Sequence, residues 1–194
     1  MTADSANPQV QHFMIYKPYG FLSQFVAERR KRKPTLSELG EFPAGIMAIG
    51  RLDHDSEGLL LLTTDGKTSH NIRSKSIEKE YYVQLDGEIT DQAITRLCEG
   101  VEIGIKGEKY YTLPCRARRL TLTPDLPPRG RKIRDARHGP TSWVSITITE
   151  GKNRQIRKMT AAVGFATLRL VRVRIGDINL GKLTPGEVRP LSLV

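Results

Sequence analysis

The sequence predicts an α+β fold that is rich in strands and contains a few short helices. Most apolar segments are short runs, either continuous or alternating with polar residues, and such runs are typical of strands. Only two longer segments, 90–101 and 153–163, have the apolar spacing of an amphipathic helix. No internal repeat is evident in the 194 residues, which favours one domain.

The first two strands are predicted at 12–16 and 46–49. The turn signal Lys17-Pro18-Tyr19-Gly20 ends the first strand, because proline cannot donate a ladder hydrogen bond and glycine favours a turn. Between the strands, the basic run 28–33 has no apolar period, so we expect a solvated loop. Residues 35–39 are expected to form a short helical turn.

A polar loop, Gly50 to Gly58, lies directly before the apolar run Leu59 to Leu62. This run predicts a buried strand at 59–63, closed by the turn signal Asp65-Gly66. The loop holds three acids, and ionised carboxylates close to a core cost free energy unless a cation pairs with them. We therefore expect the loop to serve chemistry or metal binding.

The rest of the chain predicts three strands, two helices and one long loop. Alternation indicates strands at 81–85 and 143–149, with Tyr81 on the apolar face of the first. Thr90 is the expected N-cap of the first helix.

The second helix, 153–163, carries Arg154 and Lys158 one turn apart and therefore presents a cationic face. It lies between the segment 124–142, which we interpret as a long, mobile, basic loop, and a strand at 167–175.

The charge of the chain indicates a polyanionic partner. Lysine and arginine outnumber aspartate and glutamate by 31 to 21, and the formal net charge is +10. Such an excess most often accompanies nucleic-acid binding, and a basic surface without a partner is the alternative. Two isolated cysteines, Cys98 and Cys115, favour a reducing compartment. Because neither a secretory signal nor a membrane-spanning run is visible, we expect a soluble, cytoplasmic protein.

Three hypotheses explain the acids of the polar loop. The first is a calcium site, because the acids are spaced as in an EF-hand loop, but Thr64 stands where a bidentate glutamate is required. The second is a general acid–base pair, or an Asp-x-Asp metal and sugar-nucleotide site, built from Asp53 and Asp55, although in an extended segment these point to opposite faces. The third is a single nucleophilic carboxylate, Asp53, paired with a cation of the basic helix. An inert salt bridge between loop and helix is an equal alternative to the third.

Four motifs, in the order of the family, resemble those of bacterial RNA pseudouridine synthases, in the branch that modifies ribosomal RNA. They are Gly50-Arg51-Leu52-Asp53 followed by Gly58 to Gly66, Tyr16 to Gly20, Lys79 to Val83, and Glu150 to Met159. A closing motif at Leu183 to Glu187 is also similar, and the resemblance extends from about Phe13 to Leu191. It implies the pseudouridine synthase fold, with a mixed, mostly antiparallel sheet and two lobes flanking a central catalytic cleft.

The resemblance implies a role for each candidate residue. Asp53 is the catalytic nucleophile, Arg157 is its ion-pair partner, and Tyr81 stacks on the target uracil. The basic residues expected to bind RNA are Lys17, Arg51, Arg129, Arg131, Lys132, Arg154, Lys158, Arg172 and Arg174. No metal or other cofactor is implied, because the isomerisation of uridine neither gains nor loses atoms.

The resemblance also implies a single catalytic domain over 1–194, with one lobe at 11–77 plus 185–194, another at 78–184, and a flexible lead at 1–10. Many members begin with an RNA-binding domain of the S4 type, and no separate S4 domain is expected here, as in the large-subunit branch called the E type. The expected partner is 23S ribosomal RNA, and we expect a monomer that uses no small-molecule cofactor and no membrane. A non-catalytic RNA-binding or ribosome-assembly factor on the same fold is the alternative.

Overall fold

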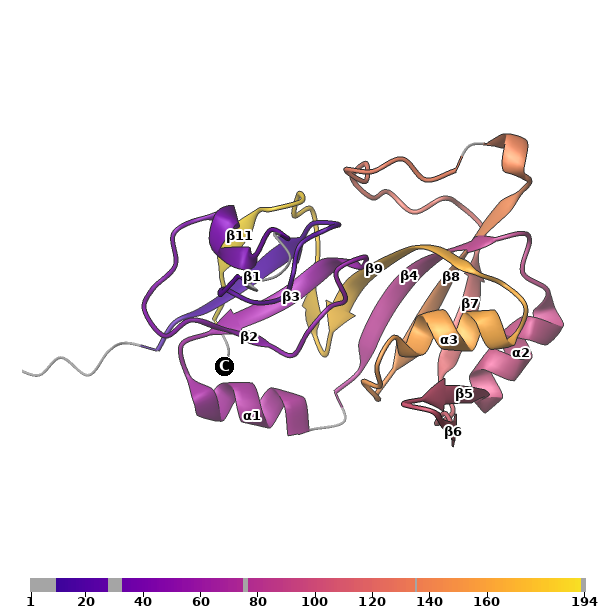
Figure 1. The fold of residues 1–194 in the computed structure, drawn as a ribbon, viewed down its shortest axis with the longest axis horizontal. Coiled ribbons are helices and arrows are strands. Elements are labelled where there is room, and N and C mark those ends of the chain that lie inside the picture. Colours follow the sequence, from indigo (N-terminus) through magenta and orange to yellow (C-terminus); the bar gives the residue numbers. More distant parts are fainter. Residues whose placement is uncertain (1–9, 28–32, 75–76, 135, 193–194) are drawn as a thin grey trace, which may run out of the picture.

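The computed structural model describes residues 10–27, 33–74, 77–134 and 136–192, and its largest element is one sheet (Figure 1). The strands of this sheet are β1 (His12–Lys17), β2 (Met47–Ile49), β3 (Glu57–Thr63), β4 (Lys79–Asp86), β7 (Arg116–Leu120), β8 (Thr141–Ile148), β9 (Thr167–Ile175), β10 (Ile178–Asn179) and β11 (Val188–Pro190). The remaining described strands, β5 (Glu102–Ile105) and β6 (Glu108–Tyr111), form a separate hairpin.

The described strands of the large sheet have the order β11-β1-β3-β9-β4-β8-β7, with β2 paired to β3 and β10 paired to β9. Every pair among them is antiparallel except β3 with β9, which run parallel over two register positions. The expected mixed, mostly antiparallel sheet is therefore confirmed.

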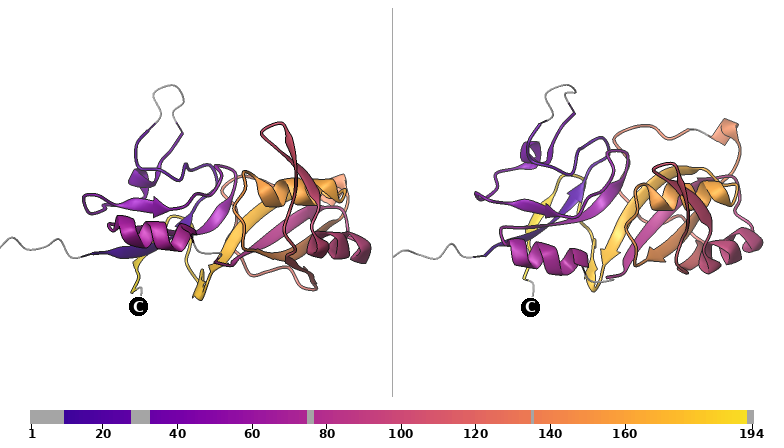
Figure 2. Two further views of the ribbon diagram at one scale, coloured as in Figure 1. Left: turned by 90° about the horizontal axis from the view of Figure 1, so that it is seen from below. Right: turned by 60° about the horizontal axis from the view of Figure 1, so that its bottom comes forward.

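Three α-helices are described: α1 (Gly66–Ser74), α2 (Asp91–Glu99) and α3 (Gln155–Ala162). Helix α1 contacts β2 and β3, whereas α2 contacts β7 and α3 contacts β5 and β9. Figure 1 shows α1 at one end of the molecule with β1, β2, β3 and β11, and the other two helices at the opposite end; both views of Figure 2 keep this division. No described helix is long and apolar enough to cross a membrane.

The parallel contact between β3 and β9 joins the two ends of the molecule. At this contact Gly58 pairs with Arg172, and Glu57 pairs with Val171. Gly58 has a φ of +101°, and a Cβ atom there would lie 2.3 Å from the carbonyl oxygen of Arg172. Only glycine fits this close backbone approach without strain, so the polar loop can end directly against β9.

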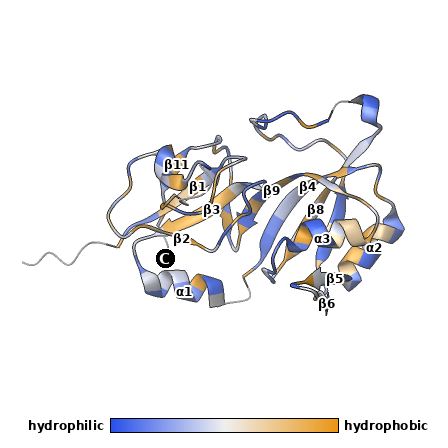
Figure 3. Cartoon of the chain, in the orientation of Figure 1, coloured by the Kyte–Doolittle hydropathy of each residue, from blue (hydrophilic) through white to orange (hydrophobic). Residues whose placement is uncertain are grey.

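Strand β3 is buried on both faces, which explains its continuous apolar run. Leu60 and Leu62 belong to the larger hydrophobic cluster, whereas Leu59 and Leu61 belong to a second cluster. In Figure 3, β3 is coloured as largely hydrophobic, whereas the projecting basic loop is mostly hydrophilic. The larger cluster includes residues from both expected lobes, so the core does not separate them. The lobe boundaries stay a prediction.

The structure confirms the strands and helices that were predicted from periodicity, with ends that differ by at most two residues. It also contains elements that were not expected, namely α1, β5, β6, β7, β10 and β11. The turn signal at Asp65 is the start of α1, where its carboxylate accepts hydrogen bonds from the backbone N–H groups of Lys67 and Thr68 at 3.2 and 2.8 Å. The expected lead at 1–10 and the basic run at 28–33 lie outside the described residues, except for Val10 and Lys33.

Candidate active site

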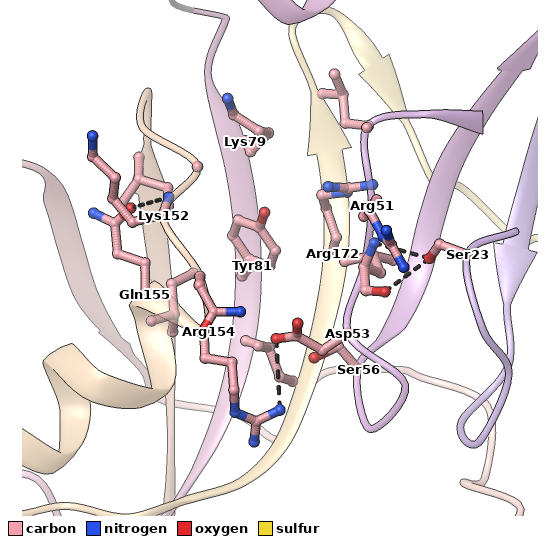
Figure 4. Close-up of a pocket in the computed structure, with 18 of the residues that line it drawn as sticks. Ser23, Arg51, Asp53, Ser56, Lys79, Tyr81, Lys152, Arg154, Gln155 and Arg172 are labelled. Carbon is pink, nitrogen blue, oxygen red and sulfur yellow. Dashed lines mark hydrogen bonds and ion pairs between the residues drawn. The ribbon is translucent and has the colours of Figure 1, made fainter. Parts of the chain in front are cut away.

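A cleft of about 690 Å³ opens where β9 leaves β3 and pairs with β4. Its walls carry most of the residues that the motifs singled out, including Arg51, Asp53, Tyr81, Arg154 and Arg172. Figure 4 shows Tyr81 between Arg154 and Arg172, with Asp53 facing Arg154. The motifs, which are far apart in the sequence, therefore meet in one concave site.

Asp53 lies in the polar loop, and its neighbours hold the backbone of that loop. The Ser23 hydroxyl both donates to the carbonyl of Leu52 at 2.8 Å and accepts from its N–H at 3.0 Å. The N–H of Ser56 donates to the Asp53 carbonyl at 3.0 Å. The Asp53 side chain stays 32% exposed on the cleft, with Arg154 Nη1 at 3.7 Å from its Oδ2 atom. A partly open carboxylate is thus presented on a fixed loop.

The ion-pair partner predicted for Asp53 was wrong in this structure. Arg157 lies with Asp55: its Nε atom is 3.5 Å from Asp55 Oδ2, and its Nη2 atom donates to the Asp55 carbonyl at 2.7 Å. The cation within 4 Å of Asp53 in the described chain is Arg154. The loop turns the carboxylate of Asp55 toward α3 and that of Asp53 into the cleft, so Arg157 meets Asp55.

Asp55 is the main link between the polar loop and α3. Arg154 donates to both of its carboxylate oxygens at 2.8 Å, a bidentate arrangement. Burial raises the pKa of this carboxyl, but the hydrogen bonds from Arg154 and the charge of Arg157 outweigh it and lower the pKa to about 2. The family resemblance assigned no role to Asp55, and its ion pairs give it a structural one.

Arg154 has a left-handed backbone, with φ of +51° at the N-cap of α3. This conformation is strained for a residue other than glycine and needs support from its surroundings. Glu150 supplies that support: it accepts hydrogen bonds from Gln155 Nε2 at 2.7 Å and from the Tyr110 hydroxyl. Gln155 in turn accepts from the N–H of Lys152 at 3.0 Å. The turn that positions Arg154 is therefore fixed on both sides.

Glu57, the third acid of the loop, is buried and paired with Arg169. Arg169 donates to its two carboxylate oxygens at 2.8 and 3.0 Å, and neither side chain is more than 7% exposed. With Asp55 and Glu57 both occupied by arginines, the loop lacks the free oxygen ligands that the calcium hypothesis requires. Arg169 was not expected as a site residue; the signal for it was an arginine within an apolar strand, where a buried cation needs an acid as partner.

Tyr81 and Arg172 form the floor of the cleft. They are register partners on β4 and β9, and the Arg172 guanidinium carbon lies 6.0 Å from the Tyr81 ring centroid. Arg172 Nε donates to the Leu59 carbonyl at 2.7 Å, which holds the guanidinium in place. Its Nη2 atom is buried without a hydrogen-bond partner among the described residues. Tyr81 is 9% exposed, so it is at once part of the core and part of the cleft wall.

Two of the residues expected to bind RNA have their cationic groups bound within the protein. Lys17 is fully buried, and its Nζ atom donates to the carbonyls of Pro18 and Phe21 at 2.9 and 2.8 Å. Burial lowers the pKa of Lys17 to about 7. Arg174 pairs with Glu80 and Glu78 at 3.0 and 3.2 Å. Their cationic groups are thus held by backbone carbonyls or carboxylates in this structure, and RNA contact by these two stays a prediction.

The other expected RNA-binding residues differ in their surroundings. Arg129 stacks over the Tyr19 ring at 4.4 Å and donates to the Leu168 carbonyl at 3.0 Å, so it holds the basic loop against the protein. Arg131 and Lys132 are exposed on that loop. Arg51 is exposed on the wall of the cleft, and Lys158 is half-buried on α3 outside it. RNA contact by these residues stays a prediction.

The comparisons with known proteins agree with the geometry of the cleft. The family described as RNA pseudouridylate synthase matches residues 11–162. The chain belongs to this family. It is an RNA pseudouridine synthase, and the expected fold and enzyme class are confirmed.

Several relatives of the synthase cover nearly its whole length. A protein of Xanthomonas campestris pv. campestris, named ribosomal large subunit pseudouridine synthase E, is 46% identical over 178 residues, which cover 91% of this chain and 92% of the relative. A protein of the same name from Vibrio parahaemolyticus is 43% identical over 91% of this chain and 72% of its own length. A crystal structure of a pseudouridylate synthase matches with a TM-score of 0.74 and 32% identity, covering 95% of this chain and 71% of that chain.

Proposed function

We propose that the synthase isomerises a uridine of large-subunit ribosomal RNA to pseudouridine, with Asp53 as the catalytic carboxylate. The observation that carries this proposal is the position of Asp53, a partly exposed acid on the cleft wall, in a loop whose other two acids are paired with arginines. The relatives named for the large subunit and the net charge of +10 support ribosomal RNA as the substrate.

The reaction breaks the N-glycosidic bond, turns the uracil, and forms a C–C bond to the same ribose. All atoms are retained, so the protein has to supply positioning and charge stabilisation. Asp53 could add to C1′ of the ribose or to C6 of the base, or could take a sugar proton. In each route the positive charge of Arg154, at 3.7 Å, offsets the negative charge of Asp53.

The target uridine has to leave its stack to reach Asp53. Unstacking costs a few kcal/mol, which stacking on an aromatic ring and phosphate contacts can offset. Tyr81 lines the same cleft as Asp53, and its ring is fixed by the core behind it. We assign the stacking of the flipped uracil to Tyr81. Because all these residues come from one chain, the proposal requires only a monomer.

The test replaces Asp53 by asparagine, which keeps the shape of the side chain and removes its charge. Asp53→Asn should abolish pseudouridine formation in large-subunit ribosomal RNA, mapped by sequencing, while RNA binding is retained. Asp177→Asn, an exposed acid outside the cleft, is the matched control and should retain activity. Wild-type conversion by the Asp53→Asn protein would refute the assignment of Asp53. If the pseudouridines of large-subunit ribosomal RNA are unchanged in cells that lack the synthase, this RNA is refuted as its substrate.

A further inference from the structure

A second cavity adjoins the catalytic cleft. It has a volume of about 680 Å³ and lies between the end of α1, strand β2 and the segment 23–27. The two cavities share Ser23, Gly50, Arg51 and Arg73 on their walls. A polymer bound in the cleft can therefore continue along the protein surface into this groove.

Two arginines at the shared wall have their charges available. Arg51 makes one long hydrogen bond, from Nη2 to Gln24 Oε1 at 3.4 Å. Arg73, in the last turn of α1, donates from Nε to the Ser69 carbonyl of its own helix at 3.2 Å. Within the described residues neither lies within 4 Å of a carboxylate, whereas Arg154, Arg169 and Arg174 are all ion-paired. Both guanidinium groups are exposed, so each could bind an anion without breaking an ion pair.

Apart from Gln24, the remaining wall of the groove is apolar. It is formed by Phe25, Val26, Ile46, Met47 and Ala48, and within this set Val26 is 79% exposed and Met47 36% exposed. An apolar wall that includes the aromatic ring of Phe25, beside two arginines without ion pairs, suits single-stranded nucleic acid, because bases stack on aromatic rings while phosphates meet the cations.

We propose that the groove binds the single-stranded nucleotides that flank the target uridine on one side, with Arg73 and Arg51 on their phosphates. This inference rests on the proposed function, because the flipped uridine in the cleft defines where the RNA enters the groove. The occupant is RNA of the same strand, since the groove is continuous with the cleft and its charge is complementary to phosphate. Arg73 is thereby a substrate-binding residue that the sequence motifs do not contain.

The first experiment measures steady-state kinetics on fragments of large-subunit ribosomal RNA centred on the mapped uridine, with each flank trimmed in turn. Arg73→Ala should raise KM roughly tenfold on the full fragment, because a hydrogen bond to a charged group contributes on that scale. Trimming one flank should raise the wild-type KM by a similar factor and remove the difference between variant and wild type. Arg73→Lys should restore part of the affinity.

Arg96→Ala is the matched control, since Arg96 is also an exposed arginine in the last turn of a nine-residue helix. It should have the wild-type KM on every fragment. An Arg73→Ala protein with unchanged KM on the full fragment would overturn the proposal. A KM defect of Arg73→Ala that keeps its full size after either flank is trimmed would also overturn the proposal, because the effects of the substitution and of trimming would then be independent.

A second experiment does not depend on turnover. Binding of a labelled oligouridylate is followed by fluorescence anisotropy over a range of salt concentrations. Arg73→Ala should reduce the slope of log affinity against log salt by about 0.7, the value for one phosphate contact on a single strand. An unchanged slope would overturn the proposal that the groove binds RNA. A wild-type protein that binds the oligouridylate with this slope but converts no ribosomal uridine would count against the proposed function and leave the groove supported.

Discussion

Replacing Asp55 by asparagine tests whether the link between the polar loop and α3 stabilises the fold. The pKa of this carboxyl falls from its ordinary value of 3.8 to about 2 in the folded protein. A difference of that size corresponds to about 2 kcal/mol of stability at neutral pH. The side chain is 27% exposed, so solvent screens this energy only partly. Asp55→Asn should therefore lower the free energy of unfolding by about 2 kcal/mol.

The assay is urea unfolding of the wild type and the variant between pH 7 and pH 3. Because the folded-state pKa is depressed, the stabilisation is complete above the unfolded value of 3.8 and is lost as the pH falls toward about 2. The difference between the two proteins should thus stay constant from pH 7 to about pH 5, where Asp55 is ionised in both states. It should shrink as the pH falls below 4.

Asp53→Asn is the matched control, since Asp53 lies two residues away and its nearest cation is at 3.7 Å. Its stability should change by less than about 1 kcal/mol, in the range of exposed ion pairs. The two variants should also differ in activity, because Asp55→Asn should retain reduced turnover whereas Asp53→Asn should have none. Equal stability of Asp55→Asn and the wild type at pH 7, or a difference that does not change with pH, would refute the reasoning.

Two further substitutions test the supports of the site. Glu57→Gln should lower the free energy of unfolding by about 3 kcal/mol, because Arg169 is left buried with an uncompensated charge; Glu102→Gln, in an exposed pair with Lys109, should change it by less than about 1 kcal/mol. A loss of the same size in both variants, measured by urea unfolding, would contradict a special role for the buried pair. Glu150→Gln should lower kcat roughly tenfold with little change in KM, because the turn that holds Arg154 is loosened. Equal kcat for this variant and the wild type on the same ribosomal RNA fragment would show that the turn is held in another way.

Local pattern was sufficient for the central strands and for two helices. The run at 59–63 became β3 because both faces of that strand are buried, and the stripe of α2 lies on the core as its period predicts. Helix α1 could not be found this way, because among residues 66–74 only Ile72 is a large apolar residue and the helix depends on the cap from Asp65 and on contact with β2. Strand β7, Arg-Ala-Arg-Arg-Leu, has little apolar pattern and exists because its backbone pairs with β8.

The sequence by itself determined the family resemblance and the identity of the candidate catalytic acid, because motifs of fixed residue type and order carry that information. Only the tertiary structure decided which cation pairs with which acid. Arg154 and Arg157 lie three residues apart on the same turn, and the backbone of the polar loop decides that Asp55, not Asp53, receives Arg157. Likewise Lys17 and Arg174 look like RNA ligands in sequence, yet burial and nearby acceptors occupy them. Such pairings depend on distances of a few ångströms between elements far apart in the chain, which local pattern does not encode.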